Sequence, residues 1–304
     1  MSVFLNSNHE LRSGWKFTVY VSFFLIIWIA TGLALSMVIA RRDDLLADPL
    51  VLLALNEIGL LVPAVSALWL SVTFMDHRPF RTFGVGFLPR WRNDLLFGLG
   101  LAAGMLAVLI GGCYAFGYVR MHWTGRQAPA GTLLATFGLL LLAAAIEELV
   151  FRGFPLQILI DGIGKWPATI GMSTLFGAMH WNNPNSSLLG TVNTIVAGIL
   201  LSLAYVRTRS LWAPYGIHAG WNVGLGFVLG LPLSGVDIAS LWTTGTAGSE
   251  TILGGDYGPE GGLLATFIFA AAAVIVEKHG PINRTETRPG GHTWWRHRDR
   301  AGNS

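Results

Sequence analysis

The chain has 304 residues, of which 52% are hydrophobic and only 12% are charged, whereas an ordinary soluble domain carries about 25% charged residues. This composition excludes a soluble enzyme, and the many aromatic residues together with a single cysteine exclude a disordered chain and a disulfide-rich scaffold. The net charge is +3, but none of the usual nucleic-acid-binding motifs is present, so we expect no nucleic-acid partner.

Apolar runs predict about eight transmembrane helices, because a helix needs about 20 predominantly apolar residues to cross a bilayer. They lie at about 15–40, 50–74, 94–119, 131–151, 167–181, 188–206, 211–231 and 261–277. We therefore predict an all-α fold, a polytopic helical bundle that forms one membrane domain over 1–304. The first run is too long for a signal-peptide core and is interpreted as a retained span. The fourth helix is expected to continue through Pro155 towards Ile160, with a kink at the proline.

Basic residues predict the orientation of these helices. With the N-terminus inside, sixteen of the twenty Lys and Arg residues fall on the cytoplasmic side, which is the bias that inserted membrane proteins show. Both termini are therefore expected in the cytoplasm, and 278–304 is interpreted as a basic cytoplasmic tail. The longest loop, about 232–262, has no Lys or Arg and is expected on the opposite side, as a flexible connection or as a lid.

Five acidic or imidazole side chains are predicted to lie within the apolar segments. An ionised side chain at the bilayer centre costs roughly 2.5–3.5 kcal/mol on insertion scales, so ionisable residues in these segments indicate a structural or functional role. They are Glu57, Glu147, Glu148, His180 and His218. Glu57 has three open interpretations: it reaches the membrane surface, it bonds to another helix, or it lines a substrate route.

Two adjacent acids end the fourth apolar run, in the stretch Glu147-Glu148-Leu-Val-Phe-Arg152. Adjacent positions on a helix point about 100° apart, so the two carboxylates face different surroundings. Glu148 and Arg152 have the i, i+4 spacing of an ion pair, which leaves Glu147 free to face something else. The alternative is that both acids anchor the helix end at the cytoplasmic interface.

Two further stretches place polar groups on later helices. His180 ends a helix of small residues directly before an Asn-Asn-Pro break, where exposed backbone groups favour a water-containing cavity or an aqueous interface. Gly216, Gly220 and Gly224 form a close-packing ridge. His218 and Asn222 are offset from that ridge by about 200° and present donors on nearly the opposite face, towards a cavity or a neighbouring helix.

Taken together, Glu147-Glu148-x-x-x-Arg152, Phe176-x-x-x-His180 and His218-x-x-x-Asn222 resemble the CAAX-protease and bacteriocin-processing family of intramembrane endopeptidases, also called the CPBP or Abi family. The resemblance covers about 132–231, which corresponds to the catalytic core of the family. It implies a glutamate-type intramembrane protease that acts on a membrane-associated, prenylated or otherwise lipidated peptide or protein in the lipid bilayer.

The resemblance also implies a role for each motif residue. Glu147 would be the general base, with His180 helping to hold and activate the attacking water, and His218 and Asn222 would stabilise the oxyanion. Glu148 and Arg152 would be a supporting pair. We expect no cofactor, although Glu147, His180 and His218 could supply the three protein ligands of a catalytic zinc ion if zinc is present.

Two other classes of function stay open at this stage. A noncatalytic immunity or scaffold protein of the same family could retain the pocket for binding, and a proton-coupled transporter, which ranks lower, could relay protons through the same side chains. Serine and cysteine protease chemistry is disfavoured, because Cys113 lies in an apolar helix and no Gly-x-Ser-x-Gly motif is present. An Arg to Lys ratio of 17 to 3 is compatible with a bacterial plasma membrane protein.

Overall fold

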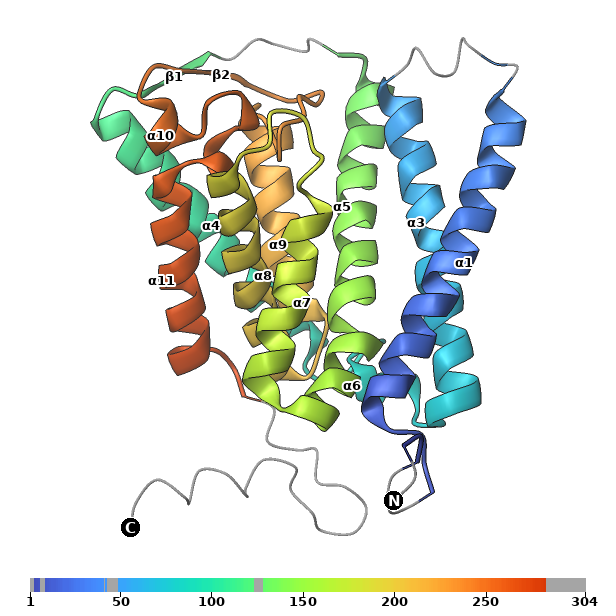
Figure 1. The fold of residues 1–304 in the computed structure, drawn as a ribbon. Coiled ribbons are helices and arrows are strands. Elements are labelled where there is room, and N and C mark those ends of the chain that lie inside the picture. The colour runs from blue at the N-terminus through green and yellow to red at the C-terminus, as the bar shows by residue number, and fades with distance from the viewer. Residues whose placement is uncertain (1–2, 6–8, 41, 43–48, 123–127, 283–304) are drawn as a thin grey trace, which may run out of the picture.

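A computed structural model describes residues 3–5, 9–40, 42, 49–122 and 128–282, and shows a bundle of helices with a small sheet at one end (Figure 1). The basic tail expected at 278–304 lies outside the described residues from position 283 onward. The helices are α1 (Ser13–Ile39), α3 (Pro49–Ser71), η1 (Val72–Asp76), η2 (Phe80–Phe83), α4 (Trp91–Ala115), α5 (Ala130–Arg152), α6 (Phe154–Ile163), α7 (Lys165–Met179), α8 (Leu188–Thr208), α9 (Trp212–Asn222), η3 (Val223–Val228), α10 (Glu250–Leu253), η4 (Gly255–Tyr257), η5 (Pro259–Gly261) and α11 (Leu263–His279).

Within the described part of the chain, five helical segments are long and apolar enough to cross a membrane. They are Ser13–Ile39, Leu50–Asp76, Trp91–Ala115, Ala130–Ile163 and Leu188–Thr208. The other three predicted spans are helical but shorter: α7 has 15 residues, α9 has 11 and continues as the 6-residue π-helix η3, and α11 has 17. The structure thus supports a helical membrane bundle but not the full count of eight spans.

The fourth predicted helix breaks earlier than expected. α5 ends at Arg152, Gly153 has a non-helical ψ of −117°, and α6 starts directly afterwards. A Cβ at Gly153 would lie 2.8 Å from the carbonyl oxygen of Leu149, so only glycine fits this corner. Pro155 is in the first turn of α6, where its missing N–H costs nothing. The kink expected at Pro155 is therefore wrong, because the chain already turns at Gly153.

The glycine ridge of α9 packs against α4, as its spacing predicts. A Cβ at Gly216 would lie 2.6 Å from the carbonyl oxygen of Leu95, and one at Gly220 would lie 2.9 Å from Cβ of Ala102. The backbones of α4 and α9 therefore approach closely along this ridge. This contact fixes the rotation of α9 and directs His218 and Asn222 away from α4.

Three apolar cores lie within the described part of the bundle. The largest joins α4, α8, α9 and α11, a second joins the α1–α3 pair to η2 and α6, and a third joins α5, α6, α7 and α8. In Figure 1 the α1–α3 pair stands beside α5, on the side of α5 away from α4 and α11. Side chains of α1, α3 and α5 all line the cavity described below.

The long loop after η3 is folded rather than a plain connection. Its strand β2 (Thr243–Thr246) pairs antiparallel with β1 (Val119–His122), with Val119 opposite Thr246. The sheet lies at one end of the bundle, whereas α1 begins and α11 ends at the other (Figure 1). The described ends of the chain therefore share one side of the bundle.

Candidate active site

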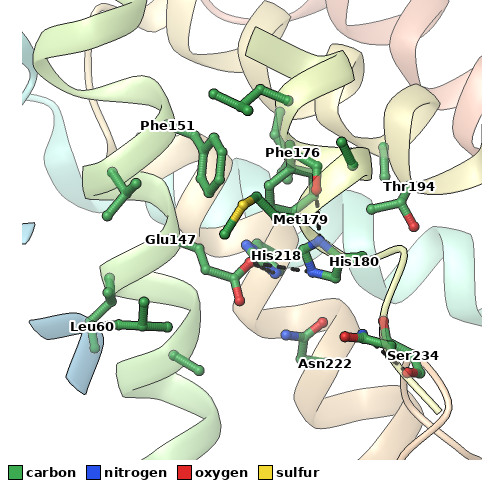
Figure 2. Close-up of a pocket in the computed structure, with 18 of the residues that line it drawn as sticks. Leu60, Glu147, Phe151, Phe176, Met179, His180, Thr194, His218, Asn222 and Ser234 are labelled. Carbon is green, nitrogen blue, oxygen red and sulfur yellow. Dashed lines mark hydrogen bonds and ion pairs between the residues drawn. The ribbon is translucent and has the colours of Figure 1, made fainter. Parts of the chain in front are cut away.

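A cavity of about 880 Å³ lies between α1, α3, α5, α7, α8 and α9, and is closed at one side by the loop that follows η3 (Figure 2). Most of its lining side chains are apolar, such as Phe24, Leu60 and Met172. Its polar lining includes Glu147, His180, His218, Asn222 and Ser234. Glu147, His180, His218 and Asn222 thus meet at one wall of the cavity, although they come from α5, the end of α7 and α9.

Glu147 projects from α5 into this cavity, and its side chain is 26% exposed (Figure 2). Its Oε2 atom lies 3.7 Å from Nε2 of His218 and 4.0 Å from Nε2 of His180. Oε2 itself is buried and has no hydrogen-bond partner. Two imidazoles therefore face one carboxylate oxygen at distances too long for direct hydrogen bonds.

Glu148 points the other way, into the protein, with a side chain that is 1% exposed. Its Oε1 atom accepts a hydrogen bond from Nη1 of Arg152 at 3.1 Å, so the predicted i, i+4 ion pair is present. The same oxygen lies 2.8 Å from Nδ1 of His218. Arg152 is fully buried, and its guanidinium lies 4.3 Å from the ring centre of Phe176.

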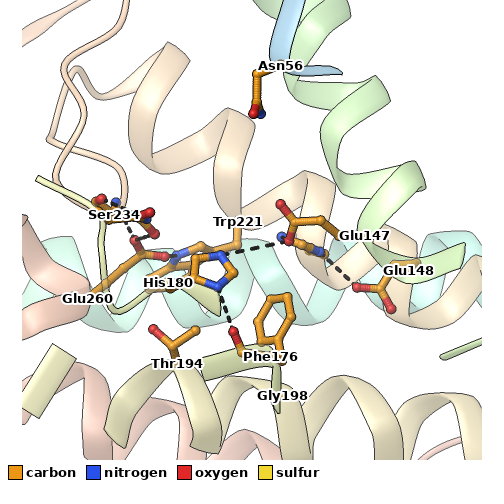
Figure 3. Close-up of polar contacts among 12 residues, drawn as sticks. Asn56, Glu147, Glu148, Phe176, His180, Thr194, Gly198, Trp221, Ser234 and Glu260 are labelled. Carbon is orange, nitrogen blue, oxygen red and sulfur yellow. Dashed lines mark hydrogen bonds and ion pairs between the residues drawn. The ribbon is translucent and has the colours of Figure 1, made fainter. Parts of the chain in front are cut away.

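His180 caps the C-terminal end of α7, and its Nδ1 atom lies 2.8 Å from the carbonyl oxygen of Phe176 (Figure 3). The Asn-Asn-Pro break follows directly. There Asn183 donates a hydrogen bond from Nδ2 to the carbonyl oxygen of Ser234 at 3.2 Å. The break therefore ties α7 to the loop after η3, and it leaves Nε2 of His180 directed at Glu147.

His218 and Asn222 lie one turn apart on α9, and both line the cavity. Figure 2 shows the Asn222 amide between Glu147 and Ser234. The π-helix η3 begins at Val223, directly after this turn. The spacing thus places both side chains on the cavity face, as expected for the face opposite the glycine ridge.

Glu260, in η5, is a site residue that the sequence did not reveal. Its Oε1 atom accepts a hydrogen bond from Nε1 of Trp221 at 2.9 Å, and its Oε2 atom accepts bonds from the backbone N–H and the hydroxyl of Ser234, both at 2.7 Å (Figure 3). Nearby, burial raises the pKa of the Tyr257 phenol, and the negative charge of Glu260 raises it further. No periodic signal marks Glu260, since the contact joins an irregular loop to a helix.

Glu57 also lines the cavity, from α3. Its Oε1 atom accepts a hydrogen bond from Nδ2 of Asn56 at 3.3 Å, and the residue is 4% exposed. This placement is incompatible with a side chain that reaches the membrane surface. Glu57 thus faces the same cavity as Glu147.

Glu147, His180 and His218 are the candidate zinc ligands. Protein atoms that bind a tetrahedral zinc ion at about 2.0–2.1 Å lie about 3.3 Å from one another, but Oε2 of Glu147 lies 3.7 and 4.0 Å from the two imidazole nitrogens. No group of three or more His, Cys, Asp or Glu side chains in the described ranges is placed to hold a metal ion. In this arrangement Oε2 of Glu147 lies farther from both imidazole nitrogens than two ligands of one zinc ion lie from each other.

Residues 129–224 match a family model described as type II CAAX prenyl endopeptidase Rce1-like. This segment is Rce1-like. The match contains Glu147, His180, His218 and Asn222, and it confirms the resemblance to the CAAX-protease and bacteriocin-processing family. The apolar helices and this match together support an integral membrane protein.

A second comparison gives a relative without a known activity. The chain is 29% identical over 193 residues to an uncharacterized protein, YyaK, of Bacillus subtilis (strain 168). The aligned part is 60% of this chain and 63% of the relative, so the match spans less than two thirds of that protein.

Proposed function

We propose that this chain is an intramembrane endopeptidase that hydrolyses a peptide bond of a membrane-associated or lipidated peptide. The observation that supports this proposal best is that Nε2 of His180 and Nε2 of His218 both face Oε2 of Glu147 inside a mostly apolar cavity. Such a cavity accepts an apolar substrate and still holds the few polar groups that hydrolysis needs.

Glu147 and His180 activate the attacking water. A backbone carbonyl only accepts hydrogen bonds, so His180 donates from Nδ1 to Phe176, and in the neutral imidazole Nε2 is then an acceptor. A separation of 4.0 Å between this nitrogen and Oε2 of Glu147 allows one water to donate a hydrogen bond to each. The lone pairs of that water are left to attack a peptide carbonyl.

His218 has a different partner and therefore a different role. An ionised carboxylate only accepts hydrogen bonds, so His218 donates from Nδ1 to Glu148, whose charge stabilises the imidazolium form. Nε2–H of the imidazolium and the amide of Asn222 then donate to the oxyanion as the C–O bond forms. When the C–N bond breaks, the proton that Glu147 took from water passes to the leaving amine.

The proposed mechanism needs no metal ion, because a carboxylate and an imidazole can activate water by themselves. Metal analysis of the purified protein tests this part of the proposal. Stoichiometric zinc, with loss of cleavage on chelation and its return when zinc is added, would contradict it. A protein that cleaves at the same rate before and after chelation would support it.

We also propose the eight-span topology, with both termini in the cytoplasm of a bacterial plasma membrane. Labelling of single cysteines in a Cys113→Ala protein tests the orientation, with Ser249→Cys in the long loop and His279→Cys at the end of α11, two exposed positions. A membrane-impermeant maleimide added to intact cells should label Ser249→Cys and spare His279→Cys. The reverse pattern, or equal labelling, contradicts the proposed topology.

The proposed activity is tested by peptide cleavage with purified protein and with Glu147→Ala, His180→Ala and His218→Ala variants that still fold. Each variant should lose cleavage, since each removes one part of the reaction. Retention of wild-type cleavage by all three variants would show that these residues are not the catalytic centre. Binding without cleavage by the wild-type protein would indicate an immunity or scaffold protein, and proton-coupled solute flux would indicate a transporter.

A further inference from the structure

A carboxylate that the proposed mechanism does not use lines the cavity on α3. Leu53, Asn56, Glu57 and Leu60 share one face of this helix and all line the cavity, as their spacing of three and four residues requires. Figure 3 shows Asn56 projecting from α3 towards the space beside Glu147. The face of α3 is therefore the part of the cavity wall that lies across from the α5 carboxylate.

One carboxylate oxygen of Glu57 has no hydrogen-bond partner among the described residues. Its Oε1 atom accepts the hydrogen bond from Asn56, but its Oε2 atom is buried without a partner. A buried unsatisfied acceptor on a carboxyl costs at least about 1–3 kcal/mol, and leucine at this position would avoid that cost. The free oxygen can accept a hydrogen bond from a bound ligand.

The charge of the cavity indicates what kind of donor this is. Three carboxylates line it, those of Glu57, Glu147 and Glu260, and no Lys or Arg belongs to the described residues that do so. The nearby cation, Arg152, is engaged with Glu148. Glu260 already accepts three hydrogen bonds from the described residues. Of the two cavity carboxylates other than Glu147, Glu57 is therefore the one with an oxygen that can accept a hydrogen bond from a ligand.

We propose that Glu57 is a substrate-recognition residue that binds a cationic side chain of the peptide, a lysine ammonium or an arginine guanidinium. This inference rests on the proposed peptidase function and names the class of substrate. The apolar stem of such a side chain packs along Leu53 and Leu60, while its charged end reaches the free oxygen of Glu57. The peptide bond to be cut then lies towards Glu147, on α5.

Binding to the full chain tests this proposal without requiring cleavage. The protein carries Glu147→Gln and is placed in phosphatidylcholine nanodiscs. The probe is a pool of S-farnesylated nonapeptides, each with one lysine at a different position, and a matched pool with norleucine in place of lysine. Retained peptides are counted by mass spectrometry. At one or more positions lysine should be retained about tenfold better than norleucine, as one charge-assisted hydrogen bond allows.

Three variants in the same Glu147→Gln protein make the test specific. Glu57→Gln should abolish the lysine preference, whereas Glu57→Asp, which keeps the charge, should retain at least part of it. Glu250→Gln, an exposed carboxylate in α10, is the matched control and should retain all of it. Absence of a lysine preference at every position, or its persistence in Glu57→Gln, would overturn the proposal.

A lipid amine is the other source of an ammonium group. Phosphatidylethanolamine is therefore added to the nanodiscs in a parallel experiment, and the lysine preference should persist. Its loss would assign the Glu57 site to a lipid headgroup and overturn the peptide assignment. Failure of the peptidase proposal is seen separately, as absence of cleavage by the wild-type protein.

Discussion

Oε1 of Glu148 lies 2.8 Å from Nδ1 of His218, so one buried carboxylate oxygen joins α5 to α9. The same oxygen also accepts a hydrogen bond from Nη1 of Arg152. Glu148 is thus more than the partner of a structural ion pair, because it also fixes the ring orientation and the donor nitrogen of His218. Through this contact α5 supplies both the proposed base, Glu147, and the group that orients the proposed oxyanion donor.

We predict that Glu148→Gln lowers kcat by about 10²-fold while KM changes little, the loss expected for an impaired oxyanion donor. The glutamine oxygen still accepts hydrogen bonds but no longer stabilises an imidazolium at His218. Steady-state cleavage separates kcat from KM, and ¹⁵N NMR of labelled histidine should show an altered His218 signal. An unchanged kcat would mean that His218 does not act as a cation.

We predict that Arg152→Met destabilises the folded protein by about 3–5 kcal/mol, because the buried Glu148 charge loses its permanent cationic partner and keeps only its contact with His218. Equilibrium unfolding in mixed micelles measures this change. The double variant Glu148→Gln, Arg152→Met removes both charges and should recover much of the loss. A single variant as stable as the wild type would show that solvent or another group compensates the Glu148 charge.

Glu260→Gln should loosen the loop that closes the cavity. A glutamine cannot accept all three hydrogen bonds from Trp221 and Ser234, so at least one buried donor is left unpaired, at a cost of about 1–3 kcal/mol. Hydrogen exchange measured by mass spectrometry should become at least about tenfold faster in the peptide that contains Ser234. Glu250→Gln is the control, and equal exchange in the two variants would contradict the anchoring role of Glu260.

The contact between α4 and α9 is tested by a matched pair of glycines on α4. A Cβ at Gly98 would lie 2.8 Å from the backbone nitrogen of Ile217, whereas one at Gly104 meets nothing within 4 Å. Gly98→Ala should therefore destabilise the protein by about 1–3 kcal/mol, and Gly104→Ala should be neutral or stabilising by up to about 1 kcal/mol. Similar unfolding of both variants would show that the two helices are not in close contact.

Contacts within one helix could be predicted from the sequence, because helical spacing alone determines them. Glu148 and Arg152 pair at i, i+4, and His218 shares a face with Asn222 across from the glycine ridge. Contacts between helices could not be predicted in the same way. The bond from Glu148 to His218 spans 70 positions, and it depends on the depth and rotation of α9, which the close approach to α4 sets.

The differences between the predicted and the observed helices also have local causes. Hydropathy marked the eight apolar runs, but the structure ends α7 at Met179, shortly before the Asn-Asn-Pro break, and converts the end of α9 into a π-helix. The turn at Gly153 was missed because Pro155 is a stronger sequence signal for a kink. Glu260 was missed because a loop that packs back on a helix leaves no periodic pattern.

Glu147 is the proposed base, and its role is tested most directly by the cleavage rate of Glu147→Gln on a peptide that the wild-type protein cleaves. Hydrolysis should fall by about 10²–10⁴-fold, while affinity for the peptide and the unfolding temperature stay at their wild-type values. Such a result would separate chemistry from folding and binding. A Glu147→Gln protein that cleaves this peptide at the wild-type rate would contradict the proposed mechanism.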